Sequence, residues 1–402
     1  MSFKAPPEGD FEAYAKLVDA QRSHYTKLAD YGATQCSNGS GLDGLLYPLR
    51  GPITTVSTYF HNKFELCANG MTTVSDRMIE TGQDYHRSDR TAADRLAKAY
   101  PAAPTGFHEI SGGALIGSFD DHDVTLTEPA SAETDTQKNI SLELKLASGK
   151  LIGGELKGAE KVFKFLTGQS LVELLLTPLV GTYGRLKYLA EAYEQLGTAA
   201  YGVAANLRRG TWRMGGEWDG EAATAFEAYL FRWHMGTGGL GDAAKVASKA
   251  FHDGYIVVCG LVLAVLKEIN TLLEDGVKKL AEEAAEMAAG DVAIEAVGLG
   301  PEDPLADIGA GIFTAYKMYK IYKTVRTIIS VISAIESTFE AISKAVDGIG
   351  EAVTAIETFM NTPTPSLDDI KSDVVQRGAT FEQDGFWNAE AGSTRIGLLP
   401  SA

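Results

Sequence analysis

The densest carboxylate–histidine cluster in the sequence is "DDHD", Asp120 to Asp123. Carboxylate and imidazole groups are ligands of hydrolytic metal ions, but such a site needs its ligands brought together in a defined geometry. Four consecutive residues of a linker do not supply that geometry. We therefore interpret "DDHD" as a solvated loop, and an enzymatic alternative rests on this loop alone.

The remaining histidines do not build a second reactive cluster. His252 lies in a helical run and is interpreted as a histidine at a helix end. Four more stand singly on helical stretches: His24, His61, His86 and His234. No serine-hydrolase, zinc-protease, phosphate-loop or dinucleotide-binding motif occurs in a fitting context. We predict no catalytic residue, no metal site, no cofactor and no enzymatic activity.

The amino-acid composition and charge limit which classes of molecule this protein is expected to bind. The 402 residues are 45% hydrophobic, enough for a sizeable core, and carry 53 acidic against 36 basic residues for a net charge of −17. This balance argues against nucleic acid and against an anionic membrane as the main partner. The three cysteines are an odd number without a paired motif, so we interpret them as core thiols.

No segment predicts a cleaved export signal or a membrane span. The first residues lack the apolar region of a secretory signal peptide. The longest apolar run, Tyr255 to Leu266, has about 12 residues where a bilayer needs roughly 20, so we expect a buried helix.

Hydrophobic periodicity predicts a mainly α fold with an N-terminal helical hairpin. Residues 1–104 contain two helical stripes joined by turn residues at Ser37–Gly44, and the prolines from Pro101 to Pro104 end the second helix. Residues 105–154 are interpreted as a linker with possible short strands, because "NISLELKLASGKL" alternates.

The rest of the chain predicts a larger helical bundle. Residues 155–300 form a helical unit, in which the glycine-rich Met235–Asp242 is expected to interrupt a long helix. Residues 301–361 carry heptad spacing over about 60 Å of helix. Uncharged flanking positions favour packing on several neighbours over an exposed zipper. Residues 362–402 are expected to be an extended tail. The central heptad positions are Ile328, Ile332, Ile335, Phe339, Ile342 and Val346.

Two short patterns are the most specific features. In "EWDGEAATAF", Trp218 and Gly220 occupy a turn before a helix, where glycine permits a tight turn and an indole covers the hairpin end. In "YHRSD", Tyr85 and Asp89 are four residues apart and share a helical face.

Together these patterns resemble the WXG family of helical-hairpin proteins and the related proteins of type VII (ESX) secretion. The resemblance covers about residues 1–100 and 180–275. It implies that Trp218 and Gly220 form a hairpin turn and that Tyr85 and Asp89 form a secretion signal. In this family two hairpins pair into a four-helix bundle, which places the Trp turn of one beside the Tyr signal of the other. The first hairpin here lacks a Trp-x-Gly turn of its own.

The resemblance implies a non-enzymatic type VII secretion substrate that acts through helix–helix association. Its expected partner is the secretion ATPase, with a small WXG-family protein or a second copy as further possibilities and membrane contact left open. The protein would be cytoplasmic before export, then secreted or on the cell surface. One alternative is a membrane-active, pore-forming effector. Another is a cytosolic adaptor or chaperone for an exported toxin.

Overall fold

The computed structural model describes residues 5–99, 117–154, 156–218, 221–286 and 304–360. The fold is mainly α, as predicted, and the described residues contain no strand. The helices are α1 (Glu8–Thr34), α2 (Arg50–Ala99), α3 (Asp135–Ile152), α4 (Lys157–Thr167), α5 (Leu171–Leu175), α6 (Gly184–Gly215), α7 (Glu221–Thr271) and α9 (Pro304–Met360). A π-helical turn at Leu272–Val277 follows α7, and the helix then continues to Glu286.

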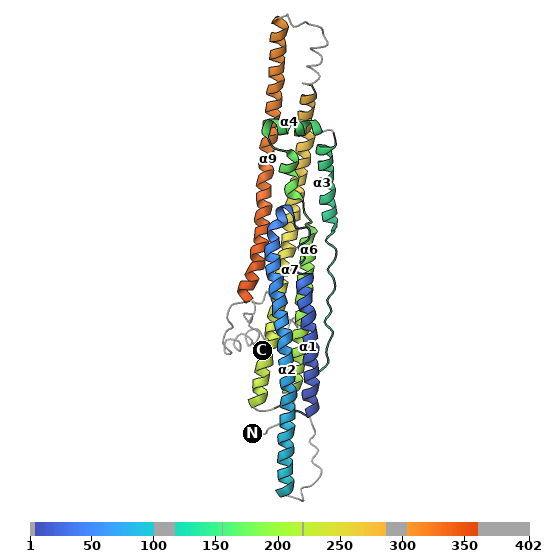
Figure 1. Cartoon of the computed structure of the whole chain (residues 1–402), viewed down its shortest axis with the longest axis vertical. Coiled ribbons are helices and arrows are strands. Elements are labelled where there is room, and N and C mark those ends of the chain that lie inside the picture. The colour runs from blue at the N-terminus through green and yellow to red at the C-terminus, as the bar shows by residue number, and fades with distance from the viewer. Residues whose placement is uncertain (1–4, 100–116, 155, 219–220, 287–303, 361–402) are drawn as a thin grey trace.

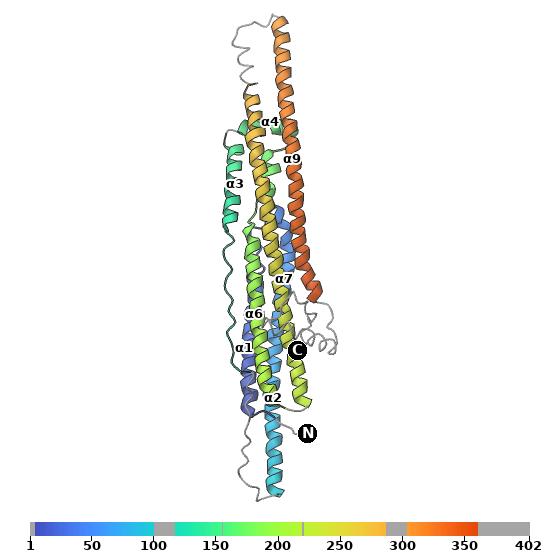
Figure 2. The same cartoon turned by 180° about the vertical axis from the view of Figure 1, so that it is seen from behind.

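Two helical hairpins, α1–α2 and α6–α7, lie side by side and form an elongated four-helix bundle (Figures 1 and 2). The apolar stripes predicted from spacing supply its centre: Tyr14, Val18 and Leu28 of α1 are fully buried, as are Phe60 and Phe64 of α2. Residues 1–104 and 155–300, which the sequence divides into separate units, therefore contribute to one continuous hydrophobic core.

Helix α9 packs along α7, and also contacts α2 and the short turn at Gly44–Leu49. Its heptad side chains face these neighbours, and each is at most 8% exposed: Ile328, Ile332, Ile335, Phe339, Ile342 and Val346. The helix thus packs within the chain on several neighbours. The predicted tail at 362–402 lies outside the described residues.

The predicted strand at 139–151 is wrong, because these residues form most of helix α3. The Thr134 side chain accepts a hydrogen bond from the Gln137 amide and caps the helix. Ile140, Ala147 and Leu151 are buried at helical spacing. The sequence fits both the period of a strand and the period of a helix. The Thr134 cap and the buried helical stripe favour the helix.

The predicted interruption at Met235–Asp242 is also wrong, because α7 runs through it without a break. Its glycines allow α6 and α7 to approach closely. A Cβ atom on Gly241 would lie 2.6 Å from the Tyr201 ring, and one on Gly197 would lie 2.9 Å from the Gly241 carbonyl oxygen. Close packing therefore compensates for the low helix propensity of glycine.

The apolar part of α7 could cross a membrane by length and composition, and it is also partly buried inside the bundle. Among the described residues, Gly236–Glu286 is long and apolar enough to cross a membrane, with a mean hydropathy of 2.1 in its most apolar window, of which 44% is buried. A second span would count only if the bent pair formed by α4 and the helices after it were taken as one. All three cysteines are buried and free, as predicted.

The close approach of α2 to α7 at Gly70 gives a stability prediction. A Cβ atom on Gly70 would collide with the fully buried Trp233 ring. We expect Gly70→Ala to lower the free energy of unfolding by about 1–3 kcal/mol, because overpacking exceeds the helix-propensity gain of roughly 1 kcal/mol. Gly260 is exposed in mid-α7 with nothing within 4 Å, so Gly260→Ala should stabilise the protein. Urea denaturation of both variants measures the difference, and equal shifts would contradict the packing.

Candidate functional site

The two residues singled out by the sequence patterns meet at one end of the bundle. Tyr85 lies on α2, and Trp218 follows α6. Their ring centroids are 5.8 Å apart with the planes nearly perpendicular, a favourable edge-to-face arrangement. The Trp218 side chain is 4% exposed, whereas Tyr85 is half-buried. The pairing of the hairpins therefore brings the Trp turn and the Tyr pattern together.

Two further rings complete what we call the aromatic end cluster: Phe11, Tyr85, Trp218 and Phe226. Phe11, in the first turns of α1, lies 5.2 Å from Trp218 and 6.1 Å from Tyr85 between centroids. Phe226 of α7 lies 5.3 Å from Trp218. Each such pair contributes about 0.5–1.5 kcal/mol beyond its buried area. Every helix of the two hairpins except α6 supplies a ring, and α6 leads directly into Trp218.

Charged groups border the aromatic end cluster. Arg213 of α6 reaches two carboxylates, with its Nη1 atom 3.1 Å from Glu217 and its Nη2 atom 3.8 Å from Asp10. Burial and then the neighbouring Glu217 charge raise the pKa of Asp10, and Arg213 opposes this shift. On the adjoining helices, His86 lies 3.5 Å from Glu8.

For two of the predicted site residues, Asp89 and Gly220, the structure gives only part of the geometry or none of it. Asp89 lies in α2 one turn after Tyr85, but its side chain is outside the described part of the structure. Gly220 falls between the described ranges, so the turn that begins at Trp218 is described only at its first residue.

An extended strap, residues 117–134, holds the two hairpins together from outside (Figures 1 and 2). It begins at Gly117, whose φ of +115° favours glycine, and a Cβ atom there would lie 2.6 Å from the Arg209 carbonyl oxygen of α6. Farther along, the Thr127 carbonyl accepts a hydrogen bond from Tyr31 of α1, and its amide donates to Gln195 of α6. The strap therefore bonds to both hairpins.

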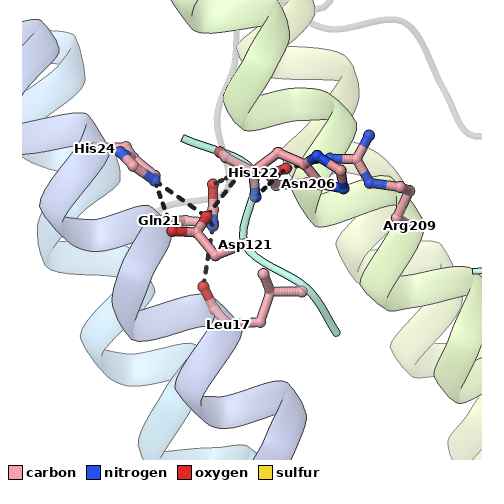
Figure 3. Close-up of polar contacts among 7 residues, drawn as sticks. All are labelled: Leu17, Gln21, His24, Asp121, His122, Asn206 and Arg209. Carbon is pink, nitrogen blue, oxygen red and sulfur yellow. Dashed lines mark hydrogen bonds and ion pairs between the residues drawn. The ribbon is translucent and has the colours of Figure 1, made fainter. Parts of the chain in front are cut away.

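Asp121 is the main anchor of the strap (Figure 3). Its carboxylate accepts hydrogen bonds from Gln21 Nε2 at 2.7 Å and Asn206 Nδ2 at 2.9 Å, and His24 Nε2 lies 3.0 Å from both of its oxygens. All four residues of "DDHD" are exposed, as the solvated-loop interpretation predicts, but the Asp121 side chain is also bonded to both hairpins. Asp123 is exposed as expected.

Sequence reasoning misses the anchor residues on the helices. It treats His24 only as a single histidine and gives Asn206 no role. One signal is present: Gln21 stands in the apolar stripe of α1, and a polar side chain there needs a buried partner. Among the described residues no group of three potential ligands could hold a metal ion. The geometry around Asp121 is that of a structural hydrogen-bond network.

Comparison of the chain with models of protein families, with curated proteins and with solved structures finds no match.

The network around Asp121 predicts a graded loss of stability. The change Asp121→Asn keeps the size of the side chain but removes its charge and points an amide at hydrogen-bond donors. We expect it to lower the free energy of unfolding by about 1–2 kcal/mol, since hydrogen bonds to charged groups contribute about 1.5–3 kcal/mol and solvent screening at the exposed Asp121 reduces this. Asp123→Asn, two residues away and exposed, is the matched control. Thermal unfolding of both measures the difference, and equal midpoints would show that the anchor is not stabilising.

Proposed function

We propose that this protein is a non-enzymatic substrate of type VII secretion that presents the aromatic end cluster to the export machinery. The contact between Trp218 and Tyr85 is the observation that carries the proposal. It is the juxtaposition that the resemblance implies for paired hairpins of this family. Here one chain supplies both hairpins.

The bundle also supports an action through helix–helix association without a separate small partner. Each hairpin buries its apolar stripe against the other, so the faces that a WXG-family partner would cover are already covered in the described residues. Part of the Tyr85 side chain is exposed at the bundle end. An aromatic side chain next to charged groups is typical of residues that dominate protein interfaces. The expected partner at this end is the secretion ATPase.

Export is tested by the distribution of the protein between culture medium and cell pellet. We expect the wild type in the medium, and none there when the secretion ATPase is deleted. Tyr85→Ala should lower the secreted fraction at least about tenfold, the effect of losing ~1.4 kcal/mol of recognition. Tyr47→Ala is the matched control, since Tyr47 is 62% exposed in the turn between α1 and α2, away from the cluster.

Retention of every variant in the pellet would reject the proposal and favour the cytosolic adaptor. Normal export of Tyr85→Ala by the ATPase would show that Tyr85 is not part of a signal. Circular dichroism of the purified variants shows whether each one is folded, so that loss of export is not confused with loss of structure.

One observation favours the membrane-active alternative. On α7 the side chains of Ile256, Val257 and Leu263 are 58%, 50% and 39% exposed, so part of the helix that is apolar enough to cross a membrane is uncovered among the described residues. Large exposed apolar patches mark interaction surfaces. We nevertheless expect no release of dye from anionic or neutral vesicles at low micromolar protein. Leakage that Ile256→Asp abolishes would replace the proposed function with membrane permeabilisation.

A further inference from the structure

The first turns of α1 cover the contact between Trp218 and Tyr85. Phe11 packs on both rings and is 1% exposed. Because Phe11 belongs to α1, whose helix begins at Glu8, the rings stay covered only while these few residues remain docked. A helix end frays at lower cost than a helix interior opens. Whatever holds the first turn of α1 therefore controls access to both rings.

The group that holds this turn has an unbalanced charge. Asp10 is next to Phe11, and its carboxylate shares the Arg213 guanidinium with Glu217, which follows α6. The Glu217 side chain is 8% exposed, and those of Asp10 and Arg213 are 23% and 25% exposed. Two carboxylates with one guanidinium carry a net negative charge in a poorly solvated place, and such a charge is costly.

The described residues present the following other groups around the pair. On α1 Glu8 adds a carboxylate, which lies 3.5 Å from His86 of α2. Tyr85 of α2 presents a phenol, and the strap presents the Phe119 ring, 5.9 Å from the Arg213 guanidinium. The amino end of α1 favours a negative Asp10 through the helix dipole. The pKa of Asp10 is nevertheless raised, because burial and the Glu217 charge outweigh the opposing Arg213 charge.

We propose that the first turn of α1 is a proton-sensitive latch over the Trp218–Tyr85 contact. The latch is closed when the Asp10 carboxyl group holds a proton, and it loosens when Asp10 is charged beside Glu217. In the closed state one carboxyl group donates to the other carboxylate, and Arg213 balances the remaining charge.

The direction in which pH changes the docking of this turn follows from the raised pKa of Asp10. An acid with a raised pKa in the docked state binds its proton more tightly there than in the undocked state. The stabilisation of the docked turn is therefore complete at a pH below the ordinary pKa of an aspartate. It is lost as the pH rises through the raised pKa of Asp10 in the docked state. Acidification therefore tightens the latch, and neutral or alkaline pH loosens it.

The biological meaning rests on the proposed function. If the rings are the surface that the secretion ATPase reads, the latch makes that surface more accessible at neutral pH and less accessible at acidic pH. The latch itself is a property of the purified chain and does not depend on export.

Hydrogen exchange of the full-length protein tests the latch. The amide protection of a peptide covering residues 8–14, corrected for intrinsic exchange rates, is measured from about pH 4 to 8. We expect protection to fall as the pH rises, by up to about tenfold per pH unit because docking takes up at most one proton. Asp10→Asn mimics the protonated acid, and should give high protection with no such slope. Glu217→Gln should also remove the slope.

The controls separate this pair from other titrating groups. Asp19→Asn changes an exposed aspartate of the same helix and should keep the wild-type slope. His86→Gln removes the neighbouring ion pair and should keep the slope as well. A slope that persists in both Asp10→Asn and Glu217→Gln, or that disappears only in His86→Gln, overturns the latch. Failure of export would leave these results unchanged, so the two proposals fail separately.

Discussion

The pairing of the two hairpins is the constraint on which every other feature depends. The rings of Tyr85 and Trp218 come from different hairpins, and so do the helices that Asp121 joins. Each hairpin alone would expose a long apolar stripe, since buried side chains meet across the pair: the Phe60 ring of α2 lies 5.7 Å from the Tyr193 ring of α6 between centroids. The end cluster and the strap are therefore consequences of one extended apolar interface, which dominates the folding free energy.

The parts of this fold that sequence predicts are those that local periodicity determines. The stripes of α1 and α2 and the heptads of α9 repeat over many turns, so single exceptions do not hide them. Glu336 and Glu357 are the only charges among the flanking positions of α9, which indicates a helix with neighbours on several sides. The meeting of Tyr85 with Trp218 is implied by the family resemblance alone, since no local rule joins two distant turns.

Sequence prediction fails where two local signals compete or where a partner decides the outcome. "NISLELKLASGKL" satisfies both a period of two and a helical stripe, and the Thr134 cap resolves the conflict. The glycines of Met235–Asp242 predict a break when α7 is considered alone. They become favourable once α6 is packed against them, as Gly197 and Gly241 show. The anchor of Asp121 unites α1, the strap and α6, and such a long-range network has no signature in any one segment.

Apolar stripes bring helices together, but they determine only weakly the register of one hairpin along the other. Hydrogen bonds in the interior between the two hairpins fix this register. Tyr14 of α1 hydrogen-bonds Thr211 of α6, and Tyr25 of α1 hydrogen-bonds Thr237 of α7. Misalignment by one helical turn would take these partners from the buried Tyr14 and Tyr25 hydroxyl groups, at about 1–3 kcal/mol each. The same register sets Trp218 level with Tyr85, so a few polar contacts determine whether the aromatic end cluster exists.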